Sequence, residues 1–285
     1  MSWMEDIMET IEYIEEHITD DLCIEDIAQH IHLSPFYLQK GFSLLCGLSI
    51  AEYIRNRKLT LAGKDLQLND EKVITTAMKY GYDSPDSFTK AFTRFHGITP
   101  IAAKNGKGAI KNFLPLKMQF SMKGGFEMNC KLMKKPSFTV IGCSRLIPYN
   151  EGYQECPKFW TEHYEEGKGQ YIKGMYGICI DENTPEGKFK YMIADDYSPS
   201  KDLAEQFETI VIPEHTWAVF PCIGTMPEDL QKVNSKIFSE WLIENNDYKI
   251  AGGYNIEYYT PITDYPKGNQ DENYYCEIWI PVEAK

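Results

Sequence analysis

Residues 81–100 read GYDSPDSFTKAFTRFHGITP, and the same framework occurs fifty positions earlier, at residues 31–50, as IHLSPFYLQKGFSLLCGLSI. The two stretches share their serine, proline, glycine and large apolar positions, whereas the polar residues between them differ. The shared positions are Ser34, Pro35, Leu38, Phe42, Leu45 and Gly47 in the first copy and Ser84, Pro85, Phe88, Phe92, Phe95 and Gly97 in the second. This pattern predicts one structural unit that is used twice with two different surfaces.

Each copy is predicted to form a helix, a short turn and a second helix. A serine caps the second helix, a proline suits its first turn because that N–H has no partner in a helix, and a glycine ends it. The second helices are expected over residues 35–46 and 85–96, after leading helices at 24–31 and 73–80. One long helix over residues 49–66 joins the copies, with Ile50, Ile54, Leu61 and Ala62 as its buried stripe, and an acidic helix over 3–17 precedes them.

Two helix-turn-helix units on one connector can address successive major grooves of double-stranded DNA without dimerisation. The varied polar faces of the second helices, with two arginines of the connector, are the expected contacts with bases and phosphates. They are Phe36, Gln39, Lys40 and Ser43 in the first copy, Asp86, Thr89, Lys90 and Thr93 in the second, and Arg55 and Arg57 in the connector. The alternative is a small helical bundle whose polar faces meet only solvent.

Charge is distributed unevenly along the chain. The net charge of the 285 residues is −13, yet residues 27–112 hold twelve basic and six acidic residues, whereas residues 1–26 hold ten acidic and no basic ones. The repeated segment is thus the basic part of an acidic protein, which is where phosphate contact is expected.

Composition limits the class of protein further. A chain of this length favours two domains. It contains no apolar run long enough to span a bilayer and its eight cysteines follow no metal-ligand spacing, so we expect a soluble, cytoplasmic protein that has no metal, no cofactor and no membrane partner.

The segment RNRKLTLAGKDL…VITTAMKYGYDSPDSFTKAFTRFHGITP resembles the signature of the AraC/XylS-type DNA-binding domain, and the resemblance covers residues 1–104. It implies a seven-helix domain that reads two adjacent major-groove segments, with Gln39, Lys40, Asp86 and Lys90 at recognition positions. A double reader of this kind favours a monomer, and RNA polymerase is a further candidate partner.

Residues 105–125 are rich in glycine and lysine and are interpreted as a linker with one short strand at 116–122. The remaining residues, 126–285, alternate apolar and polar positions in strand-like runs around two helical stretches, one of them over 227–246. The order strand, helix, strand, strand occurs twice in this region. This order predicts an antiparallel α+β domain. The fold class is therefore multidomain, with an all-α double helix-turn-helix domain followed by an α+β domain.

The pattern VIPEHTWAVFPCIGTMPEDLQKVNSKIFSEWL…YNIEYYTP…YCEIWIPV is similar to the GyrI-like domain, a duplicated βαββ module of SHS2 type that binds small molecules. With the AraC-type reader before it, this is the arrangement of Rob-like regulators. The resemblance implies that Glu257 lies in an aromatic cleft for cationic or amphipathic compounds, with Glu277 as the second choice. The expected aromatic walls, for which burial in the core is the alternative, are Trp160, Tyr176, Trp217, Phe220 and Tyr259.

These observations predict a DNA-binding transcription regulator that senses a small-molecule effector, and not an enzyme. Two alternatives remain. The GyrI-like domain could be a hydrolase of strained electrophilic compounds with Glu257 as general base, or an acidic protein-binding module. No conventional catalytic motif supports the first alternative.

Overall fold

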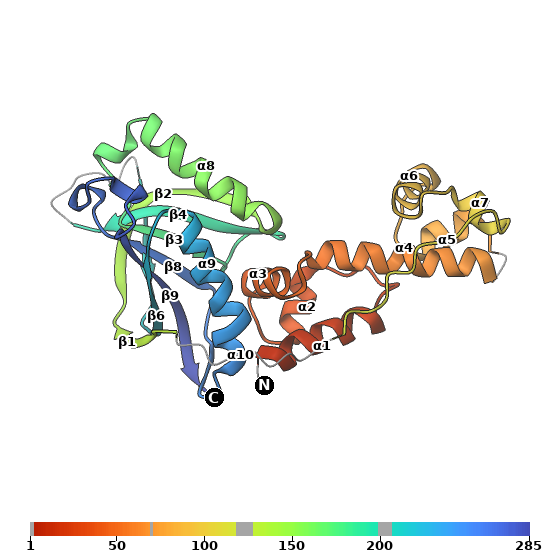
Figure 1. Cartoon of the computed structure of the whole chain (residues 1–285), viewed down its shortest axis with the longest axis horizontal. Helices are drawn as coiled ribbons and strands as arrows, with labels where there is room; N and C mark the ends of the chain where they lie inside the picture. Colours follow the sequence, from red (N-terminus) through yellow and green to blue (C-terminus); the bar gives the residue numbers. More distant parts are fainter. Residues whose placement is uncertain (1–2, 69–70, 118–127, 199–206) are drawn as a thin grey trace.

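A computed structural model describes residues 3–68, 71–117, 128–198 and 207–285, which form a helical part and a sheet-containing part (Figure 1). Helices α1 to α7 make up the described helical part. They are α1 (Trp3–Glu16), α2 (Ile24–His30), α3 (Pro35–Cys46), α4 (Ile50–Leu68), α5 (Val73–Lys79), α6 (Pro85–His96) and α7 (Pro100–Lys104). The predicted repeat is confirmed, because α2–α3 and α5–α6 are its two helix pairs and α4 joins them.

The ends of α3 and α6 follow the predicted local chemistry. The Ser34 hydroxyl accepts the N–H of Tyr37, and the Ser84 hydroxyl accepts the N–H of Ser87. Gly47 and Gly97 follow the helices with φ of 72° and 81°, a conformation that disfavours residues with a Cβ.

Each helix pair packs into a different core. The second copy has its own core, to which Leu59, Ala62 and Leu66 of α4 and Phe88 and Phe92 of α6 contribute. The buried residues of the first copy belong instead to a core that continues into the sheet-containing part. The first copy is therefore docked on the C-terminal domain, whereas the second copy lies at the far end of α4 (Figure 1).

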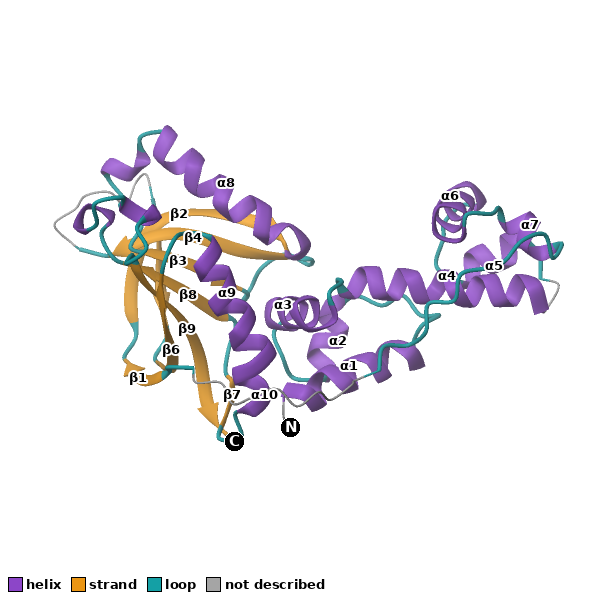
Figure 2. Cartoon of the chain, in the orientation of Figure 1, coloured by secondary structure: helices purple, strands orange, loops and turns teal. Residues whose placement is uncertain are grey.

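The C-terminal domain is an antiparallel sheet with helices on one side (Figure 2). The strands are β1 (Lys131–Lys135), β2 (Phe138–Pro148), β3 (Tyr176–Ile180), β4 (Lys188–Asp196), β5 (Glu208–Ile212), β6 (His215–Ile223), β7 (Tyr248–Ile250), β8 (Tyr254–Tyr259) and β9 (Tyr275–Ala284). The longer helices are α8 (Gly152–Glu165) and α9 (Glu228–Lys236), and α9 continues through the π-helical turn η3 (Ile237–Trp241) into α10 (Leu242–Glu244).

The strand order is β1-β6-β9-β8-β3-β4-β2-β5, with β7 beside β9. The units β2-α8-β3-β4 and β6-α9-β8-β9 occupy the two halves, which confirms the predicted duplication. Only two residues connect β1 to β2, although these strands lie in opposite halves, so the sheet must curve strongly. Its inner face encloses a separate core that includes Tyr176, Trp217 and Trp279.

Helices α1 and α3 attach the helical part to the C-terminal domain. The Trp3 indole donates to the carbonyl of Phe238 at 3.1 Å, and the Tyr37 hydroxyl donates to the carbonyl of Tyr254 at 2.5 Å. The N–H of Phe36 donates to Asp181 at 2.7 Å. The first bond fixes α1 to the C-terminal domain, and the other two fix α3 to it.

Across the described residues, none of the helices combines the length and the apolar character that crossing a bilayer requires. The expected strand at 116–122 and the predicted boundary at residue 126 fall largely in residues 118–127, which lie outside the described residues. The stretch 105–117 is described and contains neither helix nor strand.

Candidate effector cleft and DNA-binding surface

A cavity of about 1480 Å³ lies where α3 meets the C-terminal domain. Strand β8 provides Glu257, α8 and α9 provide two walls, and α3 with the start of α4 provides a third. Its lining includes Phe36, Lys40, Cys156, Trp160, Tyr191, Glu257 and Tyr259. The cavity is therefore shared by both domains.

Glu257 is half-buried at the base of this cleft and accepts two hydrogen bonds. The hydroxyl of Tyr191 on β4 donates to its Oε2 at 2.8 Å, and the hydroxyl of Tyr259, which lies on β8 with Glu257, donates to the same oxygen at 3.0 Å. The Trp160 indole donates to the Tyr191 hydroxyl at 2.8 Å and meets the Tyr259 ring edge to face, with centroids 5.4 Å apart. One carboxylate thus lies inside an ordered aromatic frame.

The electrostatics of this frame keep both tyrosines protonated. Burial, and then the charge of Glu257, hold the pKa of Tyr191 and of Tyr259 well above the usual range for tyrosine. Gly177 lies opposite Glu257 on β3, and a Cβ there would meet the Tyr191 hydroxyl at 2.4 Å and the Glu257 carboxylate at 2.8 Å. The glycine therefore makes room for the hydrogen-bonded pair.

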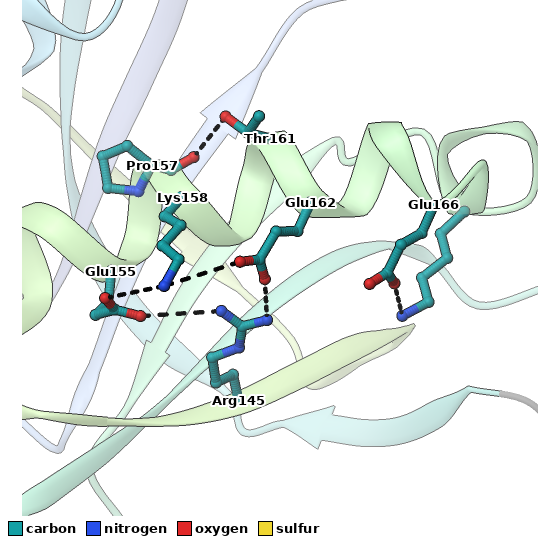
Figure 3. Close-up of polar contacts among 8 residues, drawn as sticks. Arg145, Glu155, Pro157, Lys158, Thr161, Glu162 and Glu166 are labelled. Atoms are coloured by element: carbon teal, nitrogen blue, oxygen red, sulfur yellow. Dashed lines mark hydrogen bonds and ion pairs between the residues drawn. The ribbon is translucent and has the colours of Figure 1, made fainter.

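The other side of α8 is fixed to the sheet by a group of charged residues (Figure 3). Arg145 of β2 donates to Glu162 at 2.5 Å and lies 4.0 Å from Glu155, and Lys158 bridges the same two glutamates. The Arg145 guanidinium also stacks 4.3 Å from the centroid of the Phe159 ring. These contacts hold the wall that carries Trp160.

Three of the predicted ligand-binding residues, Trp160, Glu257 and Tyr259, meet in the cleft. Tyr176, Trp217 and Phe220 were also expected to be aromatic walls of the cleft. This expectation is corrected, because all three side chains are buried and do not line it. Tyr176 and Trp217 lie in the core on the inner face of the sheet, and Phe220 is fully buried against Trp241 on the helix-covered side.

Glu277, the second choice, is also placed elsewhere. It is buried and accepts hydrogen bonds from Lys131, Tyr275 and Trp279. Burial alone would raise the pKa of Glu277, but these bonds bring it below the ordinary value. Its partners suit a structural role.

Sequence reasoning missed Tyr191, Cys156 and the contribution of α3 to the cleft. Tyr191 lies on β4, and the signal for its role is the register of that strand with its neighbours. Because β4 pairs with β3 and β3 with β8, Tyr191 reaches the side of the sheet that carries Glu257.

The predicted DNA-binding residues fall into two groups. Asp86 and Lys90 are exposed on α6 and Thr89 is partly exposed, and Arg55 is exposed on α4. The equivalent face of α3 is covered, because Phe36 and Gln39 are each only 7% exposed and Lys40 and Ser43 line the cleft. In this domain arrangement the α3 face does not form an open surface.

The expectation that Arg57 contacts DNA is also corrected. Its side chain is buried and donates to both carboxylate oxygens of Glu15, each at 2.7 Å, and to the carbonyl of Phe113. The Nε, Nη1 and Nη2 donors of Arg57 thus all face the interior of the helical domain.

Two family models match the chain. One, described as integron-associated effector binding protein, covers residues 131–282, and the other, described as helix-turn-helix domain, covers residues 27–105. The matched ranges coincide with the sheet-containing part and with the helical part that holds the repeat.

Individual relatives divide in the same way. The HTH-type transcriptional activator AarP of Providencia stuartii is 40% identical over 94 residues, which are 33% of this chain and 70% of AarP. The regulatory protein SoxS of Salmonella typhimurium is 36% identical over 100 residues, 35% of this chain and 94% of SoxS. The solved structure of SAV2435 bound to tetraphenylphosphonium is 24% identical and has a TM-score of 0.47, over 55% of this chain and 94% of SAV2435.

Proposed function

Since the chain belongs to the integron-associated effector-binding family and carries an AraC-type helix-turn-helix domain, we propose that this DNA-binding transcription regulator responds to an organic cation held at Glu257. Its C-terminal domain is a GyrI-like small-molecule-binding domain. The single observation that supports the cationic effector is the half-buried Glu257 carboxylate inside the frame of Tyr191, Tyr259 and Trp160.

The chemistry of this frame suits a flat, positively charged ligand. A carboxylate in a partly dry site attracts a cation more strongly than it would in water. Each aromatic face adds ~0.5–2 kcal/mol of cation–π attraction. The cavity is large enough for a drug-sized molecule, for which sites are typically about 300–1,000 Å³. Charge and shape thus act together on the same class of ligand.

For the DNA side, we propose that α6 presents Asp86, Thr89 and Lys90 to a major groove and that Arg55 contacts phosphate. The exposure of these side chains supports this assignment. We also propose residues 1–104, 105–125 and 126–285 as reader, linker and sensor. We propose a monomer, because both helix-turn-helix units belong to one chain. We also propose that this monomer contacts RNA polymerase at its DNA target.

Glu257→Gln is expected to weaken binding of rhodamine 6G, a cationic dye, by about 30-fold, or ~2 kcal/mol, because the variant keeps the side-chain shape but loses the charge. Fluorescence anisotropy of the full-length protein measures the affinity. The matched control is Glu283→Gln, which changes an exposed glutamate on β9 that pairs with Lys249, and it should bind the dye as the parent protein does.

Rhodamine B, a related dye with a free carboxylate, tests the sign of the charge and should bind more weakly than rhodamine 6G. Equal binding of rhodamine 6G by the parent protein and Glu257→Gln would contradict the assignment of the site. Chromatography of the dye after incubation separates sensing from hydrolysis, since a sensor returns the dye unchanged.

A further inference from the structure

The internal repeat allows a direct comparison of two equivalent faces. Positions 36 and 40 of α3 correspond to positions 86 and 90 of α6. Asp86 and Lys90 are exposed, whereas Phe36 is 7% exposed and packs on Phe189 of the C-terminal domain with ring centroids 5.2 Å apart. The chain therefore holds one of its two reading helices against the effector domain and leaves the other open.

Lys40 is the charged residue of α3 inside the cleft. Its ammonium group lies 5.3 Å from the centroid of the Phe36 ring and 5.3 Å from that of Phe238, a residue of η3. Burial lowers the pKa of Lys40, and the negative charge of Glu257 opposes that shift. A cation held by aromatic rings in the field of Glu257 has the same chemistry as the proposed effector.

We propose that Lys40 is a built-in cation of the effector cleft, so that an organic cation at Glu257 and the docked α3 oppose each other and effector binding frees α3 to read DNA. This inference rests on the proposed function, because it uses the same carboxylate. It adds the residue that couples the sensor to the reader.

The coupling follows from charge and geometry. A cationic ligand at Glu257 brings a further positive charge into the partly dry cavity that holds Lys40, and like charges repel more strongly there than in water. The ligand therefore has a higher affinity for the state in which α3 has left. Such a difference in affinity between two states is what a ligand needs in order to shift their populations. By reciprocity, DNA bound to α3 raises the affinity for the cation.

Lys40→Met tests the inference because methionine keeps much of the side-chain length and apolar contact while it removes the charge. The variant is expected to bind rhodamine 6G about ten-fold more tightly than the parent protein, since the repulsion and the competing cation are both gone. Lys90→Met, at the equivalent position of the exposed α6, is the matched control and should leave the dye affinity unchanged.

Hydrogen exchange of the peptide that contains residues 35–46 reports on the helix itself. Saturating rhodamine 6G is expected to speed exchange in this peptide of the parent protein, while exchange in residues 85–96 stays the same. Slower exchange in residues 35–46 would overturn the inference, because it would mean that the ligand seals α3 in place.

The possible failures are distinguishable. Dye binding that depends on Glu257 but is unchanged or weaker in Lys40→Met would overturn only the coupling role of Lys40. The absence of dye binding in every protein, Lys40→Met included, would overturn this inference and the proposed function together.

Discussion

Arg57→Met is expected to lower the free energy of unfolding of the helical domain by about 3 kcal/mol. The substitution removes both bonds to Glu15 and the bond to the carbonyl of Phe113. It leaves a partly buried carboxylate whose remaining hydrogen bond comes from Tyr53. The cost is large because an ionised group in a dry site loses its counter-charge. Urea unfolding followed by helical circular dichroism measures it.

The pH dependence of this effect has a definite sign. Burial would raise the pKa of Glu15, but the hydrogen bonds from Arg57 and Tyr53 and the charge of Arg57 bring it below the ordinary value. A carboxyl group with a lowered pKa in the folded state stabilises the protein above its unfolded pKa, and this stabilisation is lost as the pH falls through the folded value. The difference between Arg57→Met and the parent protein should therefore shrink in acid.

Arg55→Met provides the control, because Arg55 is two residues away on the same helix but exposed, 3.9 Å from the equally exposed Glu52. Its loss should change stability by no more than about 0.5 kcal/mol. Similar stability losses in the two variants would contradict the assignment of Arg57 to the domain interior.

The limits of the repeated helices could be predicted because the signals are local. A serine cap, a proline in the first turn and a left-handed glycine act within a few residues of each other, and α3 and α6 begin and end where those residues predict. The buried stripe of α4 was predicted less well. Ile50 and Ala62 are buried, but Ile54 and Leu61 are only partly covered, since tertiary packing selects which positions face the two cores.

The site was predicted in part for a similar reason. The alternation along β8 places Glu257 and Tyr259 on one face, and the structure joins them by a hydrogen bond. The aromatic walls could not be chosen from alternation, because this sheet is buried on both faces. Tyr176 and Trp217 satisfy the pattern as well as Tyr259 does, and the curvature that encloses them arises from strand pairings far apart in the chain.

One feature of the sequence indicates that the outer face of α3 is covered. Copy two carries Asp86 on an exposed position, where an acidic residue near a helix N-terminus is favourable. Copy one carries Phe36 at that position, a large apolar residue that a solvent-exposed helix face does not need. Two copies with the same core but an apolar residue on one surface indicate a partner for that surface, and in this chain the partner is the effector domain.

Phe36→Asp is expected to release α3 from the effector domain by weakening docking by about 3 kcal/mol. The variant loses the contact with Phe189 and brings a carboxylate next to Asp181, which already accepts the N–H of residue 36. Burial raises the pKa of Asp181, so a second acidic group there is unfavourable. The helix itself should persist, because the substitution reproduces Asp86, the residue at the equivalent position in the first turn of α6.

Small-angle scattering and hydrogen exchange of residues 35–46 measure the release in the absence of any ligand. The expected result is a larger radius of gyration and faster exchange, with the helical circular dichroism unchanged, and tighter binding of duplex DNA at fixed salt because two reading helices are then free. Asp86→Phe, the reverse change in the other copy, should alter neither the scattering nor the exchange in α3. If Phe36→Asp left α3 as protected as in the parent protein, the contacts of α3 with Asp181 and Phe189 would not be what holds it, and the effector would have no docked helix to release.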